Sequence, residues 1–75
     1  MPEQCYLKIE AALTEEEMAV MDQWASNVTE GIRNSDVTFS ATYIVLAKLW
    51  DRFNADDVDE WCKSLVQAKL QAKAK

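Results

Sequence analysis

Residues 40–53 have the sequence SATYIVLAKLWDRF, and this stretch decides the fold. Between positions 43 and 53, only Lys48, Asp51 and Arg52 are charged, so a helix here is apolar on nearly all sides. Two neighbouring helices in so small a chain can hardly cover it. We therefore expect a second copy of the chain or another protein to cover the rest.

The residues before this stretch predict another helix. Thr14 and Glu17 have the spacing of a capping box, in which each side chain binds the backbone amide of the other residue. Apolar side chains then recur every three or four residues, at Met18, Met21, Ala25, Val28 and Ile32. We predict a helix over 14–33, stopped by Gly31 or Asn34 in the left-handed conformation.

The segment from Arg33 to Thr38 is a polar connection, and Thr38 or Ser40 can cap the helix predicted over 40–53. Asn54 or Asp56 can cap a third helix over 55–72. Its apolar stripe consists of Val58, Trp61, Cys62, Leu65 and Val66. The last residues, 67–75, are mostly Ala, Lys and Gln and predict a solvated basic tail.

The N-terminal segment 5–10 alternates between apolar and polar side chains, which is typical of a half-buried strand. No second alternating run follows, so a strand here would need a partner from another chain. This favours a homodimer formed through the strand and the apolar helix. The interface residues that we predict are Leu7, Ile9, Ile44, Leu46, Leu49 and Phe53.

The fold class predicted is therefore mainly α: one small domain over 1–75, with a short N-terminal strand followed by three helices, in an intertwined homodimer. This order resembles the ribbon-helix-helix regulators over residues 5–53. The residues that carry the resemblance are Tyr6-Leu7-Lys8-Ile9-Glu10, Thr14-Glu15-Glu16-Glu17-Met18, Gly31 and Ser40-Ala41-Thr42-Tyr43-Ile44. The resemblance implies a dimeric DNA-binding transcription regulator or antitoxin that reads base edges with Tyr6, Lys8 and Glu10.

Composition argues against catalysis. The 75 residues include no His, the commonest general base and metal ligand, and one Gly, which leaves no glycine-rich phosphate loop. Cys5 and Cys62 are too few for a structural zinc site, and Cys62 lies on an apolar stripe with no base to deprotonate it. We expect no enzyme activity, no metal and no cofactor.

The same composition gives expectations about location. The N-terminal residues lack the basic region and apolar run of a secretion signal, and no apolar stretch approaches the roughly 20 residues that span a bilayer. We expect a cytoplasmic protein with reduced cysteines and no membrane partner.

The charges are unevenly distributed. All 13 acidic residues and four of the eight basic ones lie in 1–60, a formal charge of −9, whereas 61–75 carries +4. Acids gather at two predicted helix starts, where they favour the helix dipole: Glu15, Glu16 and Glu17, then Asp56, Asp57, Asp59 and Glu60. The same acids project a negative field that disfavours DNA binding and attracts proteins that bind nucleic acid.

These observations predict a non-enzymatic acidic protein that modulates or inhibits a protein partner. The negative charge favours a partner that handles nucleic acid. The acidic helix starts would steer the encounter, and Trp50 would anchor the complex. Core packing is the competing interpretation of each tryptophan, because Trp24, Trp50 and Trp61 all lie on or beside an apolar stripe.

Overall fold

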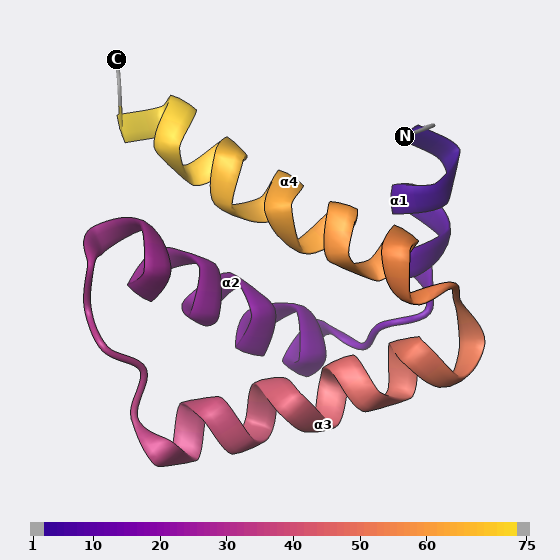
Figure 1. The fold of residues 1–75 in the computed structure, drawn as a ribbon, viewed down its shortest axis with the longest axis horizontal. Coiled ribbons are helices and arrows are strands. Elements are labelled where there is room, and N and C mark those ends of the chain that lie inside the picture. Colours follow the sequence, from indigo (N-terminus) through magenta and orange to yellow (C-terminus); the bar gives the residue numbers. More distant parts are fainter. Residues whose placement is uncertain (1–2, 74–75) are drawn as a thin grey trace.

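The computed structural model describes residues 3–73, with side chains from Cys5 onward. Four helices make up this part of the chain: α1 (Glu3–Ala11), α2 (Glu15–Glu30), α3 (Asp36–Arg52) and α4 (Ala55–Lys73). Helix α2 is central and packs against both α3 and α4, while α1 lies against the first half of α4 (Figure 1). The mainly α class expected from the sequence is confirmed.

Helix α1 stands where the alternating pattern predicts a strand, and no strand occurs in residues 3–73. The predicted strand and the count of three helices are therefore wrong. Six alternating residues also fit a helix, because Cys5 and Ile9 lie one turn apart. A helix satisfies its own backbone hydrogen bonds, whereas a lone strand leaves them open. Ile9 is fully buried in the core, and Tyr6 packs against it.

The resemblance to the ribbon-helix-helix regulators is wrong for the same reason. In that family the N-terminal strand pairs across the dimer, and here the corresponding residues form α1. The base-reading role that the resemblance implied for Tyr6, Lys8 and Glu10 loses its basis. Glu10 accepts a hydrogen bond from the Trp61 indole instead.

Helix α2 begins at the predicted capping box. The Thr14 hydroxyl accepts a hydrogen bond from the Glu17 amide at 3.1 Å, and the Glu17 carboxylate accepts one from the Thr14 amide at 2.8 Å. Of the two candidate stops, Gly31 ends the helix with a φ of 70°, a conformation that costs a residue without a Cβ little. The Asn34 side chain instead accepts a hydrogen bond from the side-chain amide of Asn27 at 2.8 Å.

Helix α3 begins earlier than the sequence pattern predicted. Ser35 caps it by accepting a hydrogen bond from the Thr38 amide, so the predicted caps, Thr38 and Ser40, are wrong. Both of those residues lie inside the helix. The earlier start places Val37 and Phe39 on α3 instead of next to it, and this lengthens its apolar surface.

Helix α4 follows a turn at Asn54, whose side chain accepts a hydrogen bond from the Asp56 amide. The helix continues through most of the predicted tail, and positions 74–75 lie outside the described residues. Lys69 and Lys73 form ion pairs with Asp22 (2.7 Å) and Glu30 (3.9 Å) of α2. These pairs follow the same order along both helices, so α2 and α4 run in the same direction.

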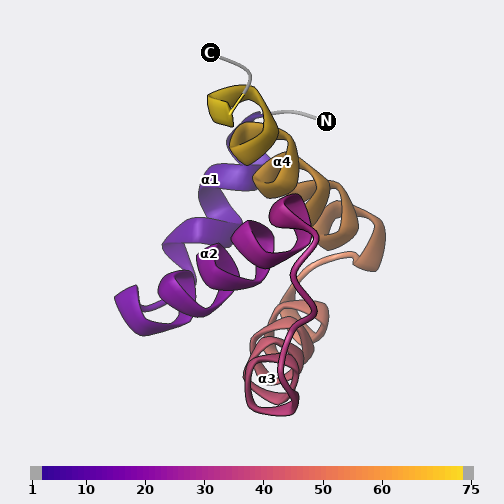
Figure 2. The same cartoon turned by 90° about the vertical axis from the view of Figure 1, so that its left-hand side faces the viewer.

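The core is built from all four helices: its buried members are Ile9, Met21, Val45, Leu49, Val58 and Trp61. Figure 2 shows α3 set apart below α2 and α4, so that one long side of α3 faces away from the other helices. The core therefore covers only part of the apolar circumference of α3.

Candidate protein interaction surface

The outward side of α3 carries five large, exposed hydrophobic side chains: Val37, Phe39, Tyr43, Ile44 and Trp50. We call this set the α3 face. Val37 is 81% exposed and Ile44 is 69% exposed, which is unusual for aliphatic side chains of this size on one helix. The buried residues of α3, Thr42, Val45 and Leu49, lie on its other side.

Two aromatic rings of the α3 face contact each other. The ring centroids of Tyr43 and Trp50 are 6.1 Å apart and their planes are inclined at 78°, an edge-to-face arrangement. Trp50, the anchor predicted from the sequence, is 41% exposed. The ring contact restricts both side chains before any partner binds, and this lowers the entropy lost on binding.

A shallow groove of about 280 Å³ lies beside the α3 face, between α2 and α3. Val37 belongs to both the face and the groove, and the groove is otherwise lined by Ala19, Val20, Gln23, Thr38 and Ala41. Its volume lies near the lower end of the roughly 300–1,000 Å³ of small-molecule pockets.

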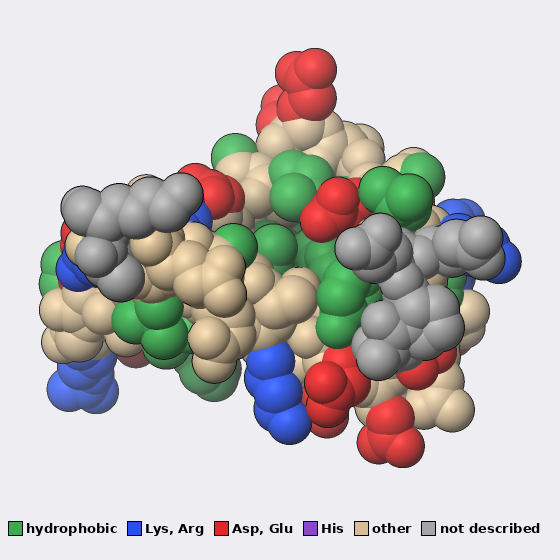
Figure 3. Space-filling view, turned by 90° about the horizontal axis from the view of Figure 1, so that it is seen from above, with side chains coloured by type: hydrophobic (Ala, Val, Ile, Leu, Met, Phe, Trp, Pro, Cys, Tyr) green, Lys and Arg blue, Asp and Glu red, His purple; other side chains and the backbone are tan. Residues whose placement is uncertain are grey.

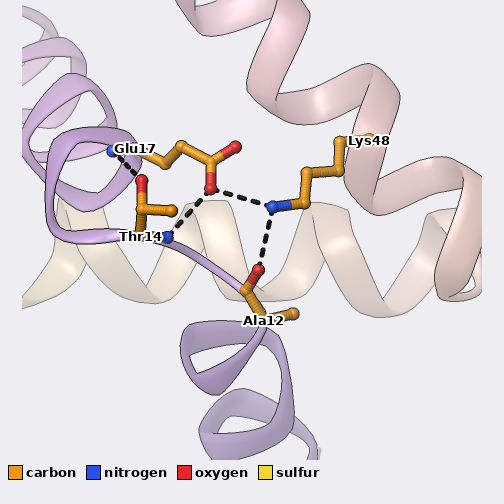
Figure 4. Close-up of polar contacts among 4 residues, drawn as sticks. All are labelled: Ala12, Thr14, Glu17 and Lys48. Atoms are coloured by element: carbon orange, nitrogen blue, oxygen red, sulfur yellow. Dashed lines mark hydrogen bonds and ion pairs between the residues drawn. The ribbon is translucent and has the colours of Figure 1, made fainter.

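The acidic residues at the start of α2 have different roles. Glu15 and Glu16 are exposed, but Glu17 is used within the fold. The Lys48 ammonium of α3 donates hydrogen bonds to the Glu17 carboxylate at 2.9 Å and to the Ala12 carbonyl at 3.0 Å, so it joins α3 to the connection between α1 and α2 (Figure 4). The hydrogen bond from Lys48, and then the one from the Thr14 amide, lower the pKa of Glu17.

The acidic residues at the start of α4 are mostly available to solvent. Asp56, Asp59 and Glu60 are exposed, with Glu60 3.5 Å from the Lys63 ammonium. Asp57 is half-buried and accepts a hydrogen bond from the Cys5 thiol at 3.5 Å.

The two acidic helix starts lie toward the same end of the molecule, because α2 and α4 run in the same direction (Figure 1). The space-filling view from above shows most of its acidic side chains over this half, where α1 and the start of α4 lie (Figure 3). The predicted acidic residues thus share one region, but Glu17 and Asp57 are engaged with side chains of the same chain.

The predicted dimer residues do not form one surface. Ile9 and Leu49 are fully buried in the core of the single chain, and Leu46 and Phe53 pack against that core. Leu7 and Ile44 are exposed on different helices. The four residues in or against the core are engaged within one chain, so a rigid second copy has no access to a surface made of all six.

Neither cysteine has the surroundings of a nucleophile. Burial, and then the nearby charge of Asp59, raise the pKa of Cys62 to about 11. Partial desolvation and the hydrogen bond to Asp57 also raise the pKa of Cys5. Both thiols are therefore protonated near neutral pH. In the described part of the chain, no three candidate ligands gather into a metal site, and no helix is long and apolar enough to cross a membrane.

Sequence reasoning identified Trp50 and Ile44 but missed Val37, Phe39 and Tyr43 as surface residues. The missed signal is the spacing of Ser35 and Thr38. A serine at a helix cap accepts a hydrogen bond from the backbone amide three residues later, and Thr38 provides that amide. A helix starting there places positions 36, 40, 43, 47 and 50 along one stripe, with Val37 and Ile44 beside it.

Comparison with known proteins adds nothing to this surface: no protein-family model, no curated protein and no solved structure matches the chain.

Proposed function

We propose that this chain is a non-enzymatic binding protein that modulates a protein partner through the α3 face. The observation that carries the proposal is the row of exposed hydrophobic side chains from Val37 to Trp50. Such rows are rare on monomeric surfaces and frequent at protein interfaces, where tryptophan and tyrosine contribute much of the binding free energy.

The charge of the chain supports a partner with a basic surface. The formal net charge is −5, and the exposed acids at the starts of α2 and α4 add a negative region at one end of the molecule. Such a field accelerates encounter with a positive surface. Proteins that handle nucleic acid present such surfaces, so we propose that this chain inhibits or regulates one of them, in the cytoplasm, where its two free cysteines stay reduced.

The homodimer expected from the sequence stays a prediction. Two of its original supports have gone, because segment 5–10 is helical and Leu49 is buried within one chain. What remains in its favour is the uncovered α3 face, which a second copy or another protein can occupy.

The test is capture of a partner from a lysate of the source organism, treated with nuclease, by three immobilised forms of the chain. The first is the unaltered chain, the second carries Tyr43→Ser with Trp50→Ser, and the third carries Leu70→Ser. Leu70 is a matched control, because its exposed fraction of 43% is close to the 41% of Trp50, but it lies near the end of α4.

We expect the unaltered chain and the Leu70 variant to retain the same protein, and the double variant to bind it at least tenfold more weakly, roughly the effect of losing one hot-spot residue. Association with the purified partner should slow as salt increases. Equal retention by all three forms, or loss of all bound material on nuclease treatment, would contradict the proposal.

A further inference from the structure

We infer that the α3 face binds an amphipathic helix of another protein, and that this helix carries a basic side chain near each of its ends. The inference rests on the proposed function and excludes a second copy of this chain as the occupant. Two acids near the ends of the face carry the inference. Asp36 and Asp51 are both exposed, and neither forms an ion pair within residues 3–73.

The two acids lie on the same side of α3 as the hydrophobic residues. At 100° per residue, positions 36 and 51 are separated by about 60° around the helix and by about 22 Å along it. Phe39, Tyr43 and Trp50 project within the same half of the circumference. Lys48 lies about 60° from Asp51 around the helix, but its ammonium is bound to the Glu17 carboxylate of α2 and to the Ala12 carbonyl, and Arg52 lies about 100° from Asp51. The exposed side of α3 is thus an apolar surface with an acid near each end.

A second copy meets like charges on this surface. In an antiparallel two-fold pair of α3 helices centred between Tyr43 and Ile44, the middle of the face, Asp36 of one copy lies opposite Asp51 of the other. In a parallel two-fold pair each acid lies opposite itself. Both arrangements place carboxylates together at an interface that excludes water, which is unfavourable.

A foreign helix with two suitably placed basic residues removes this conflict. Its lysines or arginines pair with Asp36 and Asp51 when they lie about 15 residues apart, and apolar side chains between them cover Tyr43, Ile44 and Trp50. The groove beside the face favours a helix as the occupant, because Ala19 and Ala41 are small and let a backbone approach closely.

The experiment uses two synthetic probes and the full-length chain. One probe is a helical peptide of about 22 residues, rich in alanine, with leucines along one side and two lysines 15 residues apart on that side; such a length holds a helix in water. The other has glutamates at those two positions. Binding is measured by fluorescence anisotropy at low and high salt, and circular dichroism verifies that each variant is folded.

Three forms of the chain are compared: the unaltered chain, Asp36→Lys with Asp51→Lys, and Asp22→Lys with Glu30→Lys, a control with the same change in net charge at two acids of α2 that pair with α4. We expect the unaltered chain and the control to bind the lysine peptide roughly threefold to tenfold more tightly than the glutamate peptide. In the Asp36, Asp51 variant this preference should reverse.

The inference would be overturned by equal affinities for the two peptides, by a preference that the Asp36, Asp51 variant does not change, or by binding of neither peptide. Sedimentation gives an independent answer: we expect only the 8.6 kDa monomer up to near-millimolar concentration, and a dimer that Tyr43→Ser abolishes would mean that a second copy is the occupant.

These failures differ from failure of the proposed function. Peptides that bind equally, but lose affinity with Tyr43→Ser and Trp50→Ser, would leave the α3 face as a binding surface and refute only the basic helix as its occupant. Capture from lysate that the same two substitutions do not alter would refute the proposed function itself.

Discussion

Trp61 of α4 and Trp50 of α3 occupy similar places in the apolar pattern of their helices but opposite places in the molecule. Trp61 is 0% exposed, and its indole N–H donates a hydrogen bond to Glu10 of α1 at 3.2 Å. Trp50 touches Tyr43 and is open to solvent. The core covers Trp61 but leaves much of Trp50 exposed. Apolar patterning alone therefore does not separate a core residue from a binding residue.

The largest expected effect comes from exchanging the two tryptophans for alanine. Trp61→Ala should lower the free energy of unfolding by about 3–5 kcal/mol, the usual cost of deleting a buried aromatic side chain. Trp50→Ala should cost about 1–2 kcal/mol, because 41% of Trp50 is already exposed to solvent and less packing is lost. Urea denaturation followed by circular dichroism measures both. Similar losses for the two variants would mean that Trp50 belongs to the core and that the contrast between α3 and α4 is wrong.

The caps of α2 and α3 offer a smaller, more local contrast. Thr14→Ala should cost about 1 kcal/mol in global stability, because α2 packs against both α3 and α4. Ser35→Ala removes the corresponding hydrogen bond to Thr38, but the residues that follow include the exposed Val37 and Phe39. We expect that variant chiefly to lose amide protection in the first turn of α3.

Hydrogen exchange of the two cap variants measures this difference residue by residue. A loss of protection spread through α2 and α4 in Ser35→Ala would show that the start of α3 is tied to the core as firmly as α2 is. Protection lost only near Thr14 in Thr14→Ala would show that α2 is not the central element that its packing indicates.

The parts of this structure that the sequence could predict are those determined over a few residues. The capping box of Thr14 and Glu17 was predictable because both partners lie within one turn. The sequence also offered two candidates for the left-handed residue that ends α2, and Gly31 is the one that does so. Segment 5–10 was not predictable in the same way. Its short alternation fits a strand and a helix equally. Which of the two forms depends on the tertiary packing that buries Ile9 in the core.

The candidate surface was predictable only in outline. The excess of apolar residues in 43–53 indicated that α3 would remain partly uncovered, but which residues face outward depends on where α2 and α4 lie. Likewise, the acids at the start of α2 were visible as a group, while the use of Glu17 by Lys48 is a contact across 31 positions that no local pattern encodes. Tertiary packing assigned each of these residues to the fold or to the surface.

The contact between Glu17 of α2 and Lys48 of α3 is a polar link between these two helices. We expect its removal to have the smallest effect on stability. Lys48, and then the Thr14 amide, hold the pKa of Glu17 below its ordinary value of 4.5. At acidic pH the folded chain therefore keeps Glu17 charged where the unfolded chain protonates it. The resulting stabilisation is complete above the unfolded pKa and is lost as the pH falls through the lower folded pKa.

Glu17→Gln isolates this contribution, because glutamine still accepts the capping hydrogen bond but carries no charge for Lys48. We expect the unaltered chain to be the more stable of the two at neutral pH, and urea denaturation from about pH 7 to about pH 3 should show that advantage shrinking with acid. A constant difference across this range would mean that Glu17 contributes through its hydrogen bonds to Thr14 and Lys48 and not through its charge.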